Sequence, residues 1–207
     1  IITFLNDDNL KKFLVLAFNK NWTIGLLPHP EMKQARLSYG ISPKYDRALE
    51  DILKCEKAIK TDFLFCNQQP VLNSVHIGKS FSFFSKGNNE SNIFKKIANL
   101  YQTLKSLKEM KHYSFSFETE KGKMLDTSAL GVGVFQHGCS RVFSRITLDD
   151  TNISDGMLYA LVFSPRSVLS LFKYFITFLL NPDKSQKKLP DFVGQIKTEK
   201  LIIKTKT

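Results

Sequence analysis

The spacing of hydrophobic and polar residues changes along the chain. Up to about residue 55 it predicts strands and helices in alternation, and beyond that point it predicts mainly strands. Short apolar runs at residues 1–5 and 22–27 predict strands. Between them, residues 6–19 begin with polar side chains that can cap a helix and continue with apolar residues at helical spacing, namely Leu10, Phe13, Leu14 and Ala17. A strand, a helix and a strand this close together form a βαβ unit, which implies parallel strands.

A second helix is predicted to begin at Ser42-Pro43, with Ser as its N-cap and Pro in its first turn, and to run to residue 53. Beyond residue 55 the pattern becomes that of strands. Residues 112–118 alternate between large apolar and small or polar side chains, which predicts a half-buried antiparallel strand. Further strands are predicted at residues 58–67, 71–84 and 199–206, and further helices at residues 89–109 and 166–180.

The stretch from residue 128 to 163 carries the strongest pattern. Two apolar runs, residues 129–135 and 157–163, predict strands that are buried on both faces. Gly131 and Gly133 interrupt the first run, and glycines at such positions mark a bulge or the close approach of another backbone or a ligand. Asp155-Gly156 is a turn dipeptide that places a carboxylate at the start of the second run. Formation of the turn is by itself a sufficient role for Asp155, so a purely structural reading stays open.

Composition and charge limit the chemical classes of partner that this chain is expected to bind. Of the 207 residues, 43% are hydrophobic and 12% aromatic, which is enough for a substantial core. The net charge of +11 favours an anionic partner, such as a phospholipid surface, nucleotide phosphates or nucleic acid, although solubility alone also explains dispersed lysines. Nucleic acid is the weakest of these, because the lysines are scattered and the aromatic residues alternate into the core instead of forming a stacking row.

A membrane surface fits better. The longest apolar stretch, residues 168–180, is interrupted by Lys173 and falls short of the roughly 20 residues that span a bilayer. It lies in the apolar predicted helix 166–180, which the basic loop 184–188 follows, as in peripheral membrane contacts. A core helix packed on the sheet explains the apolar residues as well, and the two roles are compatible. The three cysteines lack metal-binding spacing and indicate a reducing cytoplasm. We therefore expect a cytoplasmic protein, with peripheral attachment to an anionic membrane and a homodimer as open alternatives.

Two stretches resemble a known family. The sequence GMLYALVF follows the turn at Asp155-Gly156, and an earlier stretch carries four short matches in the family order and at nearly the family spacing: Pro28, Ala35-Arg36, Gly40-Ile41 and Ala48-Leu49. Together these stretches resemble the diacylglycerol kinases, the sphingosine kinases and their bacterial lipid-kinase relatives. In that family about half of an α/β domain precedes the position of Ile1, so we expect the sequence to be a piece of a longer one.

The resemblance implies ATP and Mg²⁺ as cofactors, but it also places two altered loops where phosphate would bind. Residues 5–9 stand in the place of Gly-Gly-Asp-Gly-Thr and contain no glycine, and residues 28–31 stand in the place of Gly-Thr-Gly-Asn. A proline has no N–H to offer to phosphate, and carboxylates repel it. The positions that correspond to cofactor-binding residues are Asn6, Asp7, Asp8, Pro28, His29 and Glu31. We expect ATP binding to be weak or absent.

The same resemblance implies a catalytic role for Asp155, either as general base on a lipid hydroxyl or as part of a metal-linked carboxylate network with Asp149 and Asp150. Without a phosphate cradle, however, the reading of Asp155 as a turn former gains weight. Two functions therefore stay open: an ATP-dependent lipid kinase, inactive if the altered loops abolish phosphate binding, and a non-catalytic module of that family that binds lipid or a protein.

The fold class predicted from these observations is α+β. Residues 1–55 form part of an α/β domain that resembles the nucleotide-binding domain of lipid kinases. Residues 56–207 form an antiparallel, sandwich-like β domain with two helices.

Overall fold

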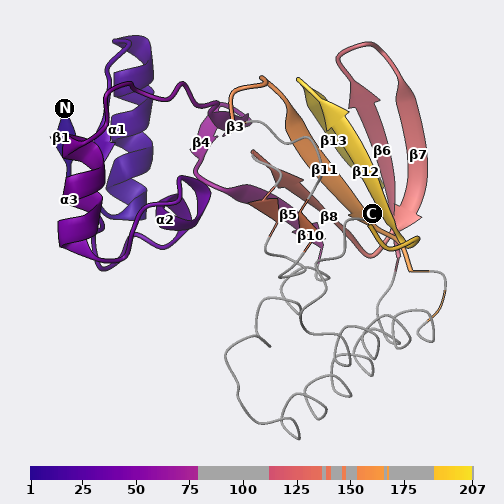
Figure 1. Cartoon of the computed structure of the whole chain (residues 1–207). Coiled ribbons are helices and arrows are strands. Elements are labelled where there is room, and N and C mark those ends of the chain that lie inside the picture. The colour runs from indigo at the N-terminus through magenta and orange to yellow at the C-terminus, as the bar shows by residue number, and fades with distance from the viewer. Residues whose placement is uncertain are drawn as a thin grey trace, which may run out of the picture. The chain divides into compact units, whose positions relative to one another are not determined.

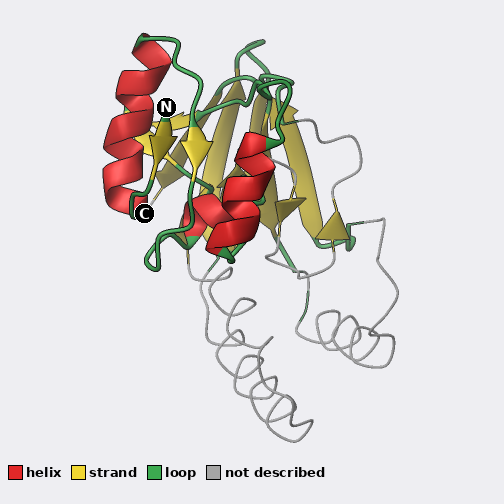
Figure 2. Cartoon of the chain, turned by 60° about the vertical axis from the view of Figure 1, so that its left-hand side comes forward, coloured by secondary structure: helices red, strands yellow, loops and turns green. Residues whose placement is uncertain are grey.

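The computed structural model describes residues 1–78, 112–136, 139–140, 146–147, 153–165, 167 and 189–206. The predicted helices at 89–109 and 166–180 and the basic loop 184–188 lie outside the described residues. The chain divides into two compact units. The first comprises Ile1–Val75 with Ile153–Gly156, and the second comprises His76–Asn152 with Met157–Thr207. The mixed α+β class is confirmed, and the three described helices all belong to the first unit (Figure 2).

The first unit opens with the predicted βαβ motif. Strand β1 (Ile2–Thr3) leads into helix α1 (Asp7–Asn19), both labelled in Figure 1. Strand β2 (Gly25–Leu26) returns parallel to β1. The Gly25 N–H donates to the Ile1 carbonyl at 2.8 Å. Both strands are shorter than their apolar runs predict: only two residues of each strand pair with the other.

Two short helices follow, α2 (Gln34–Ser38) and α3 (Tyr45–Leu53). The predicted start of the second of these at Ser42-Pro43 is wrong. Lys44 is extended, with φ −91° and ψ 122°, so the helix begins after it, and the Ser42 hydroxyl accepts the Lys44 N–H at 3.3 Å within the preceding turn.

The core of the first unit gathers side chains from α1, the turn before α2, α2 itself and the segment after β4. Its fully buried members are Leu10, Met32, Ala35 and Leu72.

The strands predicted at 58–67 and 71–84 are shorter than expected, because a tight turn at Asn67 and Gln68, both with positive φ, folds the chain into a hairpin. The observed strands are β3 (Leu64–Cys66), β4 (Gln69–Val71) and β5 (Ser74–Gly78).

The described residues of the second unit contribute to two larger sheets and one short strand pair. The four-stranded sheet has the order β12-β11-β8-β5, and the three-stranded sheet has the order β13-β6-β7 (Figure 1). The strands are β6 (Tyr113–Thr119), β7 (Met124–Ala129), β8 (Gly131–Phe135), β11 (Leu158–Phe163), β12 (Val193–Thr198) and β13 (Leu201–Lys206), and the short pair is β9 (Cys139–Ser140) with β10 (Ile146–Thr147).

The antiparallel pairing predicted for residues 112–118 is confirmed, since β6 pairs antiparallel with both β7 and β13. Phe115 and Phe117 are buried, whereas Tyr113 stays 39% exposed at the end of the strand. Among the described residues, no helix is both long and apolar enough to cross a membrane.

The apolar run at residues 129–135 is not one strand. The chain bends at Leu130, where it leaves β7 in the three-stranded sheet and enters β8 in the four-stranded sheet. Every residue of β8 is buried, and β11 beside it is buried from Tyr159 onward, as predicted for strands covered on both faces.

At Gly133 in β8 the groups that approach closely are two side chains, not the backbone or ligand that the pattern predicts. A Cβ atom at this position would lie 2.9 Å from the ring of Phe135 and 3.2 Å from Nδ1 of His76. Phe135 is 2% exposed, so its ring has no solvent into which it can turn.

We therefore predict that Gly133→Ala lowers the free energy of unfolding by about 1–3 kcal/mol, the usual cost of overpacking a core. Gly194→Ala in β12 is the matched control, because its nearest atom belongs to Val162 at 3.8 Å, an ordinary contact. Urea unfolding of both variants measures the difference. Equal stability of the two variants would show that the core accommodates a methyl group at Gly133.

Candidate functional site

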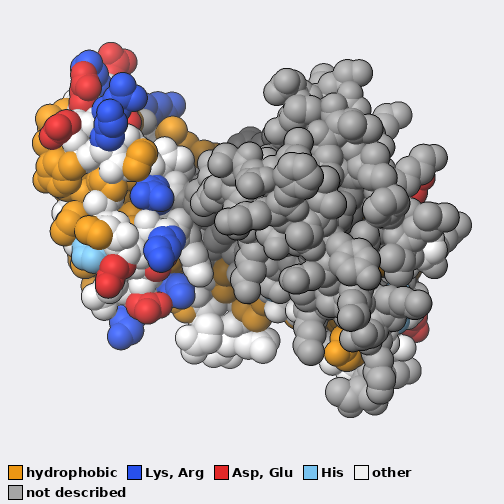
Figure 3. Space-filling view, turned by 90° about the horizontal axis from the view of Figure 1, so that it is seen from below, with side chains coloured by type: hydrophobic (Ala, Val, Ile, Leu, Met, Phe, Trp, Pro, Cys, Tyr) orange, Lys and Arg blue, Asp and Glu red, His pale blue; other side chains and the backbone are white. Residues whose placement is uncertain are grey.

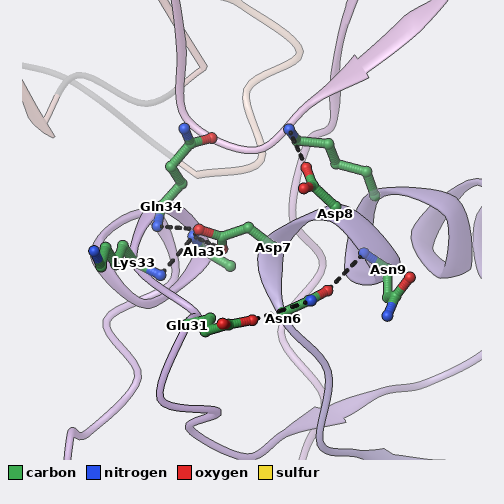
Figure 4. A network of polar contacts seen from close by, with 9 residues as sticks. Asn6, Asp7, Asp8, Asn9, Glu31, Lys33, Gln34 and Ala35 are labelled. Carbon is green, nitrogen blue, oxygen red and sulfur yellow. Dashed lines mark hydrogen bonds and ion pairs between the residues drawn. The ribbon is translucent and has the colours of Figure 1, made fainter.

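The first of the two altered loops, residues 5–9, directs one carboxylate to the start of α2 (Gln34–Ser38), which follows the second altered loop, residues 28–31. Asp7, the first residue of α1, accepts three backbone hydrogen bonds (Figure 4). Its Oδ2 takes the N–H groups of Lys33 at 2.9 Å and Gln34 at 2.8 Å, and its Oδ1 takes that of Ala35 at 3.1 Å.

These three N–H groups lie at the start of α2, where backbone donors have no partner within the helix. Lys33, at the N-cap position, makes no side-chain capping bond of its own. Asp7 therefore caps α2 from a different segment of the chain. A carboxylate suits this place because hydrogen bonds to a charged acceptor are stronger than neutral ones and because it meets the positive end of the helix.

The start of α1 is capped separately, as the sequence predicts. Asn6 is extended and its Oδ1 accepts the Asn9 N–H at 3.0 Å, while its Nδ2 lies 3.4 Å from Oε2 of Glu31. Asn6 thereby joins the first loop to the second. Asp8 points elsewhere: its side chain is 85% exposed and pairs with Lys11 at 3.3 Å. An exposed pair of this kind contributes little to stability.

The second loop is held as a tight turn around His29. The Met32 N–H donates to the His29 carbonyl at 2.9 Å, and the Glu31 N–H donates to Nδ1 of the same residue at 3.1 Å. The His29 ring also packs on Phe4, with centroids 4.9 Å apart. Pro28 directly follows the buried Leu27, and Pro30 has no N–H. The loop therefore directs two of its amides into its own turn.

Of the six residues predicted to face a cofactor, the structure brings together Asn6, Asp7 and Glu31. His29 and Pro28 shape the second loop, and Asp8 faces solvent. The site holds carboxylates and internally bonded amides, which disfavours an anion. These residues do not fit the phosphates of ATP in the way that a glycine-rich cradle would.

Asp155 lies in the turn Ile153–Gly156, which belongs to the first unit. Gly156 has φ +70°, as the predicted Asp-Gly turn requires. The Gly156 N–H donates to Oδ2 of Asp62 at 2.7 Å, the Asp62 N–H donates to the Ile153 carbonyl at 2.8 Å, and the Thr61 hydroxyl lies 3.4 Å from the same carbonyl.

Sequence reasoning missed Asp62. It lies more than ninety residues from its partner, and no local motif marks it. Asp149 and Asp150, predicted to bind a metal with Asp155, lie outside the described residues. Within the part of the chain that the structure describes, no group of three or more His, Cys, Asp or Glu side chains could hold a metal ion.

Comparison with known proteins gives a fold. No family model and no curated protein matches the sequence. Among solved structures, a candidate diacylglycerol kinase from Bacillus anthracis matches all of this chain with a TM-score of 0.68 and 17% identity, over 66% of its own length. A second diacylglycerol kinase structure from the same organism matches 89% of this chain, with a TM-score of 0.57, 16% identity and 57% of its own length covered.

A third structure, also a candidate diacylglycerol kinase from Bacillus anthracis, matches 89% of this chain with a TM-score of 0.58 and 20% identity, over 59% of its own length. The chain thus spans less than two thirds of each of these proteins. The likeness confirms the predicted fold class: this chain shares the fold of these three structures.

We predict that Asp7→Ala lowers the free energy of unfolding by about 1–2 kcal/mol, because it removes the cap of α2. Asp8→Ala is the matched control: the same change, one residue away, removes only an exposed ion pair and should cost less than about 0.5 kcal/mol. Denaturant titrations of the two variants give the comparison. If both variants lost the same stability, Asp7 would not be the cap.

Proposed function

We propose that this chain is a diacylglycerol-kinase-like protein whose phosphate position is closed by its own side chains, and that it binds lipid without transferring phosphate from ATP. The observation that carries the proposal is the bonding of the Asp7 carboxylate to the N–H groups of Lys33, Gln34 and Ala35. An anion at that place would have to displace a carboxylate that belongs to the fold.

Two neighbouring features support the same conclusion. Glu31 adds a second negative charge beside Asn6, and Pro30 removes one amide from the loop in which phosphate-binding folds present N–H groups. Neither loop contains a glycine, so side chains stand where a phosphate would need close approach to the backbone.

A lipid or an anionic membrane surface is the ligand that best fits the remaining evidence. The fold is shared with proteins named as diacylglycerol kinases, and the net charge is +11. On the face of the first unit seen in Figure 3, lysine and arginine side chains are interspersed with acidic ones. The net positive charge of the whole chain, rather than this mixed face, favours a long-range attraction to an anionic membrane surface.

Phosphoryl transfer to a lipid hydroxyl, with Asp155 as general base, is the second candidate. It is favoured by the bonding of the Asp155 turn to Asp62, which belongs to the same unit as the two altered loops. Because the loop residues do not fit the phosphates of ATP, this function would require a phosphate cradle from residues other than these loops.

The first test is nucleotide binding. We predict that calorimetry on the protein gives a dissociation constant for ATP-Mg²⁺ weaker than about 1 mM, because carboxylates occupy the phosphate position. Replacing Asp7 and Asp8 together by Gly should strengthen any residual binding, and Asp8→Gly alone should change it less, since Asp8 is directed to solvent. A micromolar dissociation constant for the parent protein would refute the closed phosphate position.

The second test is membrane binding. We predict that the protein binds vesicles containing anionic lipid, and that binding falls as salt rises. Replacing Lys184, Lys187 and Lys188 by Gln should weaken binding by roughly 1 kcal/mol per charge.

The matched control removes the same charge from exposed positions elsewhere, with Lys57, Lys60 and Lys121 replaced by Gln. Co-sedimentation with neutral and anionic vesicles measures all three proteins. If binding to the vesicles were the same at low and high salt and on neutral and anionic lipid, the basic residues would have a role in solubility only.

A further inference from the structure

The turn that carries Asp155 belongs to a different unit from the strand that follows it. Residues Ile153–Gly156 belong to the first unit, whereas β11 (Leu158–Phe163) belongs to the second. Asp62 holds the turn Ile153–Gly156 in place, because it bonds to the first and the last residue of that turn. Its N–H donates to the Ile153 carbonyl at 2.8 Å, and its carboxylate accepts the Gly156 N–H at 2.7 Å.

These two bonds bracket Asp155. One residue therefore holds the backbone both before and after Asp155, the carboxylate for which the family resemblance implies the role of general base. The bond to Gly156 is of the stronger, charge-assisted kind. Gly156 adopts φ +70°, a conformation that a glycine reaches without strain, so the turn can present its amide to Asp62. The Thr61 hydroxyl is farther from Ile153, at 3.4 Å, and contributes less.

We propose that Asp62 is a positioning residue, which sets the place of Asp155 by holding both ends of its turn. Asp62 matters for catalysis only if the second proposed function, phosphoryl transfer, is correct. The bonding of Asp62 to the turn does not depend on that function. Asn at position 62 keeps an oxygen that can accept the Gly156 N–H but removes the charge. Ala removes both.

The experiment compares the parent with Asp62→Asn, Asp62→Ala and Thr61→Val by NMR at one pH. In Asp62→Ala, hydrogen exchange of the Gly156 amide should accelerate by roughly ten- to a hundredfold, as expected for loss of a bond to a charged acceptor. The carboxyl carbon resonance of Asp155 should shift as well, because its surroundings change. Asp62→Asn should restore most of the protection, and Thr61→Val should leave both signals near those of the parent.

Unchanged protection of Gly156 in Asp62→Ala would overturn the proposal. So would an Asp155 resonance that stays in place while Gly156 becomes exposed, because Asp62 would then only tie down the backbone. Thermal melting of each variant shows whether the fold persists. If Asp62→Ala fails to fold, the parent, Asp62→Asn and Thr61→Val decide the matter. A neutral acceptor bonds more weakly, so the Gly156 amide should exchange faster in Asp62→Asn than in the other two proteins, and equal exchange in all three would overturn the proposal.

Phosphate transfer to diacylglycerol separates this inference from the function on which it rests. If the parent transfers phosphate, Asp155→Asn should lower kcat by about 10²- to 10⁴-fold. Asp62→Ala should then lower kcat with little change in KM for the lipid, and Asp62→Asn should recover part of it. If the parent shows no transfer, phosphoryl transfer fails as a function, and the NMR result alone decides whether Asp62 positions Asp155.

Discussion

Three backbone N–H groups at the start of α2 converge on the Asp7 carboxylate, and the first unit is built around this contact. Asp7 is the first residue of α1, so a single side chain joins the loop after β1 to the loop after β2. The contact holds α2 beside α1, where Met32 and Ala35 can bury themselves against Leu10. Without that carboxylate the amides at the start of α2 would need water or another acceptor.

The same contact limits what the site can do. Backbone amides at the ends of loops bind phosphate in many folds because they point outward without partners of their own. Here their hydrogen-bonding capacity is directed inward, to Asp7 and His29, and Glu31 adds charge of the wrong sign. The chain thus combines a fold shared with structures named as diacylglycerol kinases with loops that, in the function we propose, do not receive nucleotide phosphate. A shared fold therefore does not imply a shared activity.

The second unit depends on a different constraint, which is close packing in the four-stranded sheet. Strand β8 is buried along its whole length, and Gly133 leaves room for the ring of Phe135 and for His76. The bend at Leu130 lets one apolar run serve two sheets, with Ala129 ending β7 and Gly131 beginning β8. After β10 the chain returns to the first unit for the four residues of the Asp155 turn before β11 begins.

The amino-acid pattern by itself determined the βαβ motif, the Asn6 cap of α1, the alternation of β6 and the buried character of β8 and β11, because each depends on residues close together in the chain. It also carried enough family-like positions to indicate the fold. Strand β12 escaped prediction, since its middle residues are mostly exposed and polar and it forms by pairing with β11.

Only the tertiary structure decided which of the predicted loop residues meet. Asp7 and Asp8 are chemically identical neighbours, yet one caps α2 and the other faces solvent, because the direction of α1 turns only the first toward the second loop. Likewise nothing in the sequence around Asp62 distinguishes it from other surface carboxylates until the fold places the Gly156 amide within 2.7 Å of it. Contacts between residues far apart in the chain depend on where whole elements pack, and local patterns do not encode that placement.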